Sequence, residues 1–300
     1  MAQFSIYLPY PIPVFAPIYI AKEKGVFKEY GLDVSVEFPG EGHFDPFAAG
    51  TTPFGRGINA AIRLRARRGV DVKIIMELAN MGGHFLLARP EIKSLEEIKG
   101  KRIGVHPGSS TEFDLRTFLR LVNLSLSDVI LAQAGFADEK VDHFLKGEVD
   151  AILAHYDTVI RLRGQQPSLH LLGENLEIAG QGMFTSPRMI REQPDVVKGF
   201  IKAMIKAIDW AKTQRDEAIE VLLKTCTHIK DPKEVVGVYD LYVKKWNADI
   251  SVNTLKNMLQ SHYESYGDRK IEPEEILDLS MLQAARAELR QEGYRGKLGT

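Results

Sequence analysis

Residues 21–38 read AKEKGVFKEYGLDVSVEF, and this stretch shows how the chain alternates between helix and strand. A helical pattern over Ala16–Lys24 ends at Gly25, because glycine commonly terminates a helix in the left-handed conformation. A second glycine, Gly31, precedes a β-branched run over Asp33–Phe38. Helix, glycine and strand in this order predict a βα unit, in which helices connect the strands of a mainly parallel sheet.

The same alternation continues through the first two thirds of the chain. We expect further strands over 3–8, 71–77, 102–105, 129–132 and 151–154, and helices over 58–68 and 112–124. From Pro194 onward, apolar residues recur at helical spacing and no convincing strand follows. The pattern predicts two α/β lobes and a helical tail that returns to cover the first lobe.

Composition excludes several classes of protein. The 300 residues carry 39 Lys and Arg against 40 Asp and Glu, so the net charge of -1 provides no overall field for nucleic acid or an anionic membrane. The single cysteine, Cys226, allows neither an internal disulfide nor a cysteine metal cluster.

The apolar stretch Ile12–Ala21 contains two prolines, is too short to span a bilayer and lacks the features of a signal peptide. We therefore expect a cytoplasmic protein if Met1 is the native start, and a periplasmic or otherwise extracytoplasmic protein if a leader was removed.

Four segments, spread over nearly the whole chain, resemble one protein family. They are AKEKGVFKEYGLDVSVEF (21–38), SLEEIKGKRIGVHPGSS (94–110), FLKGEVDAILAHYD (144–157) and GMFTSPRMIREQPDVVKGFIKAMIKAIDWA (182–211). In this order they resemble the type II periplasmic binding proteins of the nitrate, sulfonate, taurine and thiamine-pyrimidine-precursor group. Each segment mainly marks helix ends and strand starts, so together they identify a fold more specifically than a ligand.

The resemblance implies a two-lobed α/β fold, with mixed, mostly parallel sheets flanked by helices and a helical C-terminal tail. It places lobe 1 in residues 1–84 and 186–300 and an inserted lobe 2 in residues 88–182, with hinge crossings near 84–88 and 182–186. Parallel strands would direct their carboxyl ends, and the N-termini of the following helices, to one crevice. A ligand held there between the lobes would favour hinge closure.

The segments that follow the expected strands supply the candidate ligand contacts. Aromatic side chains offer apolar area, Arg56 between two glycines offers a charge, and Ser109–Thr111 offer hydroxyls at a helix start. Plainer explanations stay open: Ser109–Thr111 would cap a helix without any ligand, the aromatic residues could be loop packing, and Arg56 and the basic run Arg63–Arg68 could form a solvated helix face. The candidates are Tyr7, Tyr10, Phe15, His43, Phe44, Arg56, Asn59, His84, His106, Ser109, Ser110, Thr111, His155, Tyr156 and Asp157.

Four of the eight histidines, namely His43, His84, His106 and His155, fall on strand-end or hinge segments. Histidine binds anions when protonated, hydrogen-bonds heteroaromatic rings when neutral, and ligates metals. No pair has a local metal-ligand spacing such as His-x3-His, so we expect neither a metal nor a cofactor. Whether these histidines bind a ligand stays open.

The predicted function is that of the solute-binding component of an ABC importer. Such a protein would be a monomer that captures a small organic anion or an aromatic or heteroaromatic molecule and delivers it to a permease and an ATPase. The sequence has no Walker loop, no Gly-x-Ser-x-Gly elbow, no zinc-protease helix and no dinucleotide fingerprint. The alternative is a leaderless cytosolic enzyme on the same fold, similar to thiamine-pyrimidine-precursor synthases or menaquinone-pathway enzymes. The cysteine-rich cluster of those synthases is absent here, because Cys226 is the only cysteine.

Overall fold

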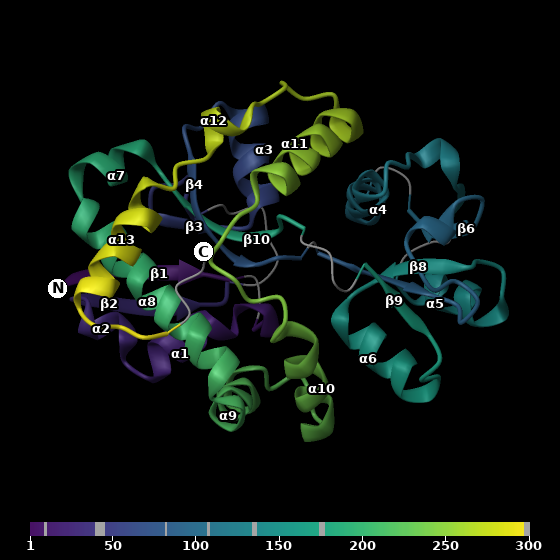
Figure 1. Ribbon diagram of the computed structural model, residues 1–300, viewed down its shortest axis with the longest axis horizontal. Coiled ribbons are helices and arrows are strands. Elements are labelled where there is room, and N and C mark those ends of the chain that lie inside the picture. Colours follow the sequence, from purple (N-terminus) through teal and green to yellow (C-terminus); the bar gives the residue numbers. More distant parts are fainter. Residues whose placement is uncertain are drawn as a thin grey trace. The chain divides into compact units, whose positions relative to one another are not determined.

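The computed structural model describes residues 1–8, 11–39, 46–81, 83–106, 109–133, 137–173 and 178–296. Contacts between residues divide the chain into two compact units. Unit 1 comprises residues 1–80, 179–252 and 271–300, and unit 2 comprises residues 81–178 and 253–270. Both units are mixed α/β, with sheets flanked by helices, as the sequence predicts (Figure 1).

Unit 1 contains two small sheets. β1 (Ala2–Tyr7) pairs in parallel with β2 (Leu32–Glu37). β10 (Gln181–Thr185) lies between β3 (Phe54–Arg56) and β4 (Lys73–Ala79) and is antiparallel to both. The strands predicted at 3–8, 33–38 and 71–77 are therefore confirmed with small shifts. The sequence pattern predicts neither β3 nor β10, because each is short and contains a glycine.

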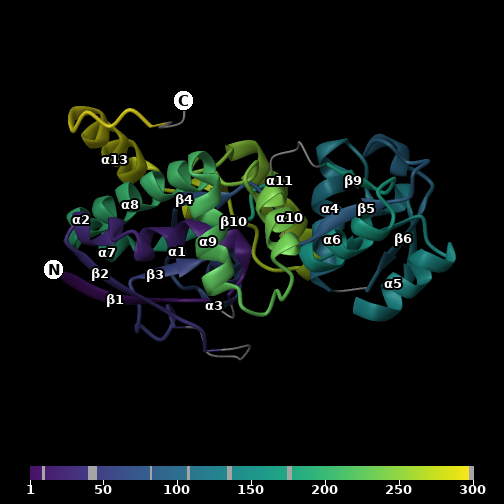
Figure 2. The ribbon, with the colours of Figure 1, turned by 90° about the horizontal axis from the view of Figure 1, so that it is seen from below.

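The helices of unit 1 come mainly from the C-terminal part of the chain. α8 packs against α1, α2 and α13, which confirms the prediction that a helical tail returns to the N-terminal region (Figures 1 and 2). α3 ends at Gly69, which has the positive φ of 64° expected of a helix-terminating glycine. The bounds are α1 (Ala16–Glu23), α2 (Val26–Glu29), α3 (Ile58–Arg68), α7 (Pro187–Glu192), α8 (Pro194–Thr213), α9 (Arg215–Thr225), α10 (Pro232–Tyr242), α12 (Pro273–Ile276) and α13 (Ser280–Gln291), and a short 3-10 turn over Pro13–Phe15 precedes α1.

An aromatic stack around Phe200 of α8 forms the centre of unit 1. The Phe200 ring lies 4.1 Å from the Phe54 ring and 5.9 Å from the Phe27 ring, centre to centre, and both pairs are nearly parallel. Trp246 is fully buried, and its indole N–H donates a 2.9 Å hydrogen bond to the carbonyl oxygen of Val14. Burial of each large side chain contributes about 1.5–3 kcal/mol. These contacts fix β3 and the turn before α1, which carry Arg56 and Phe15.

Unit 2 is built on one five-stranded sheet with the order β7-β6-β8-β5-β9. β6 (Arg102–Val105) is parallel to β7 (Ile130–Gln133) and β8 (Ala151–Ala154), whereas β5 (Phe85–Ala88) is antiparallel to β8 and β9 (His170–Leu172). The strands predicted at 102–105, 129–132 and 151–154 are confirmed. The remaining elements are α4 (Ser110–Leu121), α5 (Ala137–Lys146), α6 (Tyr156–Gln165), α11 (Val252–Tyr266) and 3-10 turns over Glu96–Ile98 and Leu126–Asp128.

Residues 253–270, which carry most of α11, group with unit 2 rather than with the rest of the C-terminal part. The reason is their packing on α4, where the ring of Tyr266 stacks on that of Phe113 at 6.1 Å and Glu264 forms an ion pair with Arg120. The spacing of apolar residues in α11 indicates a buried face but not the surface that this face covers. Among the described residues, no helix is both long and apolar enough to cross a bilayer.

Candidate functional site

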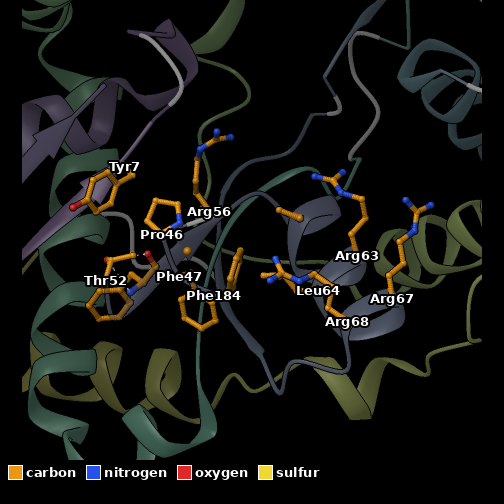
Figure 3. A pocket seen from close by; sticks show the side chains of 13 residues that line it. Tyr7, Pro46, Phe47, Thr52, Arg56, Arg63, Leu64, Arg67, Arg68 and Phe184 are labelled. Carbon is orange, nitrogen blue, oxygen red and sulfur yellow. Dashed lines mark hydrogen bonds between the residues drawn. The ribbon is translucent and has the colours of Figure 1, made fainter. Parts of the chain in front are cut away.

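A cavity of about 500 Å³ opens in unit 1 beside β3 and one face of α3 (Figure 3). Its size is typical of small-molecule sites. The structure brings Tyr7 and Arg56, two of the predicted site residues, together at this cavity. The lining includes four arginines and four aromatic residues, and it consists of Tyr7, Pro46, Phe47, Thr52, Phe54, Gly55, Arg56, Ala60, Arg63, Leu64, Arg67, Arg68 and Phe184.

Backbone pairing with β10 and the segment before it positions Arg56. The N–H of Gly57 donates a 2.7 Å hydrogen bond to the carbonyl oxygen of Gly182, and the N–H of Ile58 donates to that of Gly180 at 2.9 Å. The first donors of α3 are therefore engaged by the protein itself, so the side chain of Arg56 supplies the charge at this helix start. The guanidinium carbon of Arg56 lies 5.5 Å from the centre of the Phe15 ring, a cation–π contact that orients the side chain.

Aromatic side chains form the apolar wall of the cavity. The rings of Phe47 and Phe184 meet edge to face with centres 4.9 Å apart. Gly55 makes room for Phe184, because a Cβ at this position would lie 2.1 Å from the ring atom Cζ. Tyr7 stands at the carboxyl end of β1, as the sequence predicts for a ligand contact (Figure 3). An aromatic or heteroaromatic ligand body could pack on this wall.

Thr52 ties the loop before β3 to β1. Its side chain is 7% exposed, and Oγ1 donates a 2.7 Å hydrogen bond to the carbonyl oxygen of Ser5. The same Oγ1 accepts a 3.3 Å hydrogen bond from the N–H of Phe54. Thr52 therefore lines the cavity while its hydroxyl holds the neighbouring strand in place.

One face of α3 brings three further arginines to the cavity. Arg63 and Arg67 are four residues apart and therefore lie on one face of the helix, and Arg68 borders the cavity beside them (Figure 3). All three are exposed, which agrees with the solvated face predicted for this basic run. Arg65 is absent from the lining and instead forms an ion pair with Asp71. The sequence predicts only a solvated face here, whereas in the structure three of these side chains also border a cavity.

A second cavity in unit 1, of about 390 Å³, has a different charge. Its lining includes the carboxylates of Asp71 and Glu192 together with Arg188. The Nε atom of Arg188 donates a 2.8 Å hydrogen bond to Glu192, so this cation is already neutralised. The first cavity has no Asp or Glu among its described lining residues. The two cavities therefore differ in the acidic side chains that border them.

Two of the predicted histidines meet in unit 2. The rings of His84 and His155 lie 4.4 Å apart, centre to centre, beyond the ends of neighbouring strands. His84 is 7% exposed, and its Nδ1 donates a 2.7 Å hydrogen bond to the buried carboxylate of Asp114. This bond fixes the ring and its tautomer. Among the described residues, no three His, Cys, Asp or Glu side chains are grouped closely enough to hold a metal ion.

The serine and threonine at the start of α4 act as capping residues. Ser109 Oγ accepts a 3.2 Å hydrogen bond from the N–H of Thr111 and donates a 2.6 Å bond to the carbonyl oxygen of His106. The hydroxyls of Ser109 and Thr111 lie 2.8 Å apart. Each hydroxyl therefore has partners within this turn, which supports the capping explanation for these residues.

The remaining candidates have varied environments. Phe15 is 1% exposed and acts through its contact with Arg56. Asn59 lies in α3, where its buried Oδ1 has no hydrogen-bond partner among the described residues, and Tyr156 is 8% exposed at the start of α6. Tyr10, His43 and Phe44 lie outside the described residues, as do the side chains of Ser110 and Asp157.

Lys140 is an unusual cation in α5 of unit 2. It is 7% exposed, and within the described part of the chain no acidic residue pairs with it. Burial lowers the pKa of the Lys140 ammonium below its ordinary value of 10.5. Burying a charge in this way costs stability, and groups with perturbed pKa values are common at functional sites.

Several lining residues escape the sequence pattern. Thr52 and Phe184 reach the cavity only because β3 pairs with β10 and the preceding loop bonds to β1. The spacing of Ala60, Arg63, Leu64, Arg67 and Arg68 on one helix face was the signal that could have identified the α3 contribution.

Comparison with known proteins assigns the class and the family. The fold matches that of the crystal structure of the periplasmic aliphatic sulphonate binding protein SsuA from Escherichia coli, with a TM-score of 0.68, 17% identity, and coverage of 91% of this chain and 90% of that one. The chain thus has the fold of a periplasmic solute-binding protein. The sequence model of the NMT1/THI5-like family matches residues 12–218, and the protein belongs to that family.

Curated relatives include binding proteins and an enzyme. A Bacillus subtilis protein named for the binding of aliphatic sulfonates is 28% identical over 287 residues, covering 90% of this chain and 85% of the relative. The 4-amino-5-hydroxymethyl-2-methylpyrimidine phosphate synthase of Saccharomyces cerevisiae is 23% identical over 220 residues, covering 67% of this chain and 64% of the enzyme. The similarity is therefore higher and more extensive for the binding protein.

Proposed function

We propose that this protein is the solute-binding component of an ABC importer, and that the cavity in unit 1 binds a small organic anion with an aromatic or heteroaromatic body. One observation carries the proposal: the lining combines four arginines and four aromatic side chains, with no carboxylate among its described residues. Guanidinium groups form paired, charge-assisted hydrogen bonds with sulfonate, carboxylate and phosphate oxygens. The aromatic side chains supply apolar contact area for the rest of the ligand.

The relatives support this assignment. The Bacillus subtilis relative and the Escherichia coli structural neighbour are both named for the binding of sulfonates, and the latter is periplasmic. By the same resemblance, the partners would be a permease and an ATPase, and the protein would work outside the cytoplasmic membrane. We also propose that unit 1 corresponds to lobe 1 without residues 253–270, and that unit 2 corresponds to lobe 2 with those residues added. The crossings would then lie near residues 80–81 and 178–179, a few residues before the expected 84–88 and 182–186.

One observation favours a second function, that of an enzyme. His84 is oriented by the Asp114 carboxylate and has His155 beside it, and a histidine oriented in this way is suited to general acid–base catalysis. The yeast relative is a synthase. On this alternative, His84 would move a proton on a bound molecule, and the released product would differ from the ligand supplied.

A ligand screen tests the main proposal. Thermal-shift measurements with aromatic and aliphatic sulfonates, carboxylates and organic phosphates should identify a stabilising anion, because a ligand at 100 times its Kd stabilises the fold by about 2.7 kcal/mol. Arg56→Gln should then weaken that anion by about 1.5–3 kcal/mol. Arg65→Gln is the control, since Arg65 pairs with Asp71 away from the cavity.

The outcomes separate the two functions. Mass spectrometry should recover the bound anion chemically unchanged after long incubation. Conversion of the ligand that disappears in His84→Asn would support the enzyme instead. A screen without any binding anion, or an Arg56→Gln variant with unchanged affinity, would reject the proposed anion site.

A further inference from the structure

We propose that unit 2 binds an oxyanion group, such as sulfate or a sulfonate, at Lys140 beside the N-terminal end of α5. Lys140 is 7% exposed, and no acidic side chain in the described part of the chain forms an ion pair with it. The residues that line the cavity of unit 1 all belong to unit 1, so the inference goes beyond the proposed function and does not depend on that cavity.

Lys140 belongs to the buried face of α5. It lies four residues before Phe144, which is 2% exposed, so the two side chains share one face of the helix. The neighbouring Val141 is 5% exposed, and α5 packs against β6 and β8. Lysine side chains usually extend their ammonium groups into water. Packing removes this side chain from water instead, so its charge has lost most of its hydration.

The direction of the side chain places its charge near the start of the helix. α5 has ten residues, and Lys140 is the fourth of them. Side chains of a helix lean towards its N-terminus, so the Lys140 ammonium is directed at the first turn. The first N–H groups of a helix have no partner within the helix, and they carry the positive end of its dipole. An oxyanion at this place would contact both the lysine and these N–H groups.

The described carboxylates around α5 are engaged elsewhere. Glu139 and Asp142 of the helix itself are exposed to solvent. Glu148, which follows the helix, forms an ion pair with His143. Burial lowers the pKa of the Lys140 ammonium, which is the direction expected when no nearby carboxylate compensates the loss of water. A counter-ion for this lysine would therefore have to come from outside the described chain.

The cost of burying the charge gives the inference a measurable consequence. An unpaired charge destabilises the folded protein, whereas an apolar side chain of similar length would fill the same space without that cost. A bound oxyanion would offset the cost, because it binds the folded protein and finds no such site in the unfolded chain. Lys140→Met should therefore lose oxyanion binding even if it is the more stable protein without a ligand.

Isothermal titration calorimetry on Arg56→Gln protein tests the site in unit 2, because this background weakens the proposed site in unit 1. The probes are sodium sulfate and sodium methanesulfonate, each titrated at constant ionic strength set with sodium chloride. We expect at least one of them to bind, and Lys140→Met in the same background to weaken it about tenfold or more, since a charged hydrogen bond is lost. Binding of sulfate alone would identify a free inorganic oxyanion, and binding of methanesulfonate alone the anionic group of an organic ligand.

Matched variants locate the effect at Lys140. Lys146 is exposed in the last turn of α5, and Lys146→Met in the same background should keep the dissociation constant within about twofold. Lys140→Gln, which keeps a polar tip without the charge, should show the same loss as Lys140→Met. Unchanged affinity in both Lys140 variants would overturn the inference, and so would the absence of binding by either probe in the Arg56→Gln background.

Failure here can be told apart from failure of the proposed function. Anion binding to the parent protein that disappears in Arg56→Gln but persists in Lys140→Met would reject the site in unit 2 and leave the site in unit 1 in place. Binding that persists in Arg56→Gln and disappears in Lys140→Met would support the site in unit 2, whatever the outcome for unit 1.

Discussion

The backbone N–H of Gly57 donates a 2.7 Å hydrogen bond to the carbonyl oxygen of Gly182, which attaches the residue after Arg56 to β10. Gly182 has no space for a side chain, because a Cβ there would lie 2.9 Å from both Ile58 Cγ1 and the carbonyl oxygen of Met76. Two segments far apart in the sequence thus fit together only with glycine at this contact. The position of Arg56 depends on that fit.

Replacing Gly55 by alanine should disturb the cavity directly. The new Cβ would lie 2.1 Å from Cζ of Phe184, whose ring is buried and packed on Phe47. We expect Gly55→Ala to lower the free energy of unfolding by about 1–3 kcal/mol and to weaken the anion found in the screen. Gly164→Ala is the control, since Gly164 lies in α6 with no atom within 4 Å of its Cβ position, and this variant should be as stable as the parent or up to about 1 kcal/mol more stable. Equal stability of both variants in urea unfolding would contradict the packing described.

The buried hydroxyl of Thr52 should matter more than the exposed one beside it. Thr52→Val removes the 2.7 Å bond to the Ser5 carbonyl and should cost about 1–2 kcal/mol of unfolding free energy. Thr51 donates a comparable 2.9 Å bond to the Pro46 carbonyl, but at the exposed surface. Thr51→Val should therefore change the stability by less than about 0.5 kcal/mol. Chemical denaturation of both variants measures the difference, and a larger loss for Thr51→Val would refute this role of Thr52.

Lys140→Met should stabilise the protein at neutral pH by about 1 kcal/mol, because methionine replaces a buried charge that pairs with no acidic side chain among the described residues. Burial lowers the pKa of Lys140 in the folded state, so raising the pH removes the proton from the folded protein before the unfolded chain. The penalty for burying the charge is full below the folded pKa and is relieved as the pH rises towards the ordinary value of 10.5.

The advantage of Lys140→Met should accordingly shrink with rising pH in thermal unfolding experiments. Lys146, in the last turn of the same helix and exposed, offers the control variant Lys146→Met, whose stability difference should be small and nearly independent of pH. A Lys140→Met protein that is less stable than its parent at pH 7 would mean that the lysine has a favourable partner.

Asp114→Asn should loosen His84. The buried Nδ1 of His84 loses a charged acceptor, and we expect unfolding to become easier by about 1–2 kcal/mol. The exposed pair of His143 with Glu148 gives the matched control, because Glu148→Gln should change the stability by less than about 1 kcal/mol. Nitrogen-15 NMR of the histidine side chains would report the tautomer of His84. An unchanged tautomer together with unchanged stability would show that Asp114 does not orient the ring.

The sequence predicts much of the fold because its strands and helix stops are local features. The glycine after α3 and the β-branched runs of β2 and β6 are visible without any tertiary contact. β3 and β10 are different, since β3 becomes a strand through pairing with β10, and β10 through pairing with both β3 and β4. The assignment of α11 to unit 2 likewise depends on the rings of Phe113 and Tyr266, whose contact no periodic pattern encodes.

The residues of the candidate site also differ in whether local sequence or tertiary pairing determines them. Arg56 is predictable, because a charged residue between two glycines at a helix start is an uncommon local arrangement. Phe184 is not, because it reaches the cavity only across the β3 to β10 pairing. For Ser109, the same local pattern predicts both a ligand contact and a helix cap, and its hydrogen bonds support the cap.

The buried indole of Trp246 gives the protein an optical reporter near the cavity. Its N–H bonds to the carbonyl of Val14, the residue that precedes Phe15, and the Phe15 ring in turn supports Arg56. The other tryptophan, Trp210, instead has the Lys24 ammonium 5.3 Å from the centre of its ring. A shift of the Arg56 side chain on anion binding would alter the surroundings of Trp246, so intrinsic fluorescence of a Trp210→Phe protein would follow occupancy without any attached label.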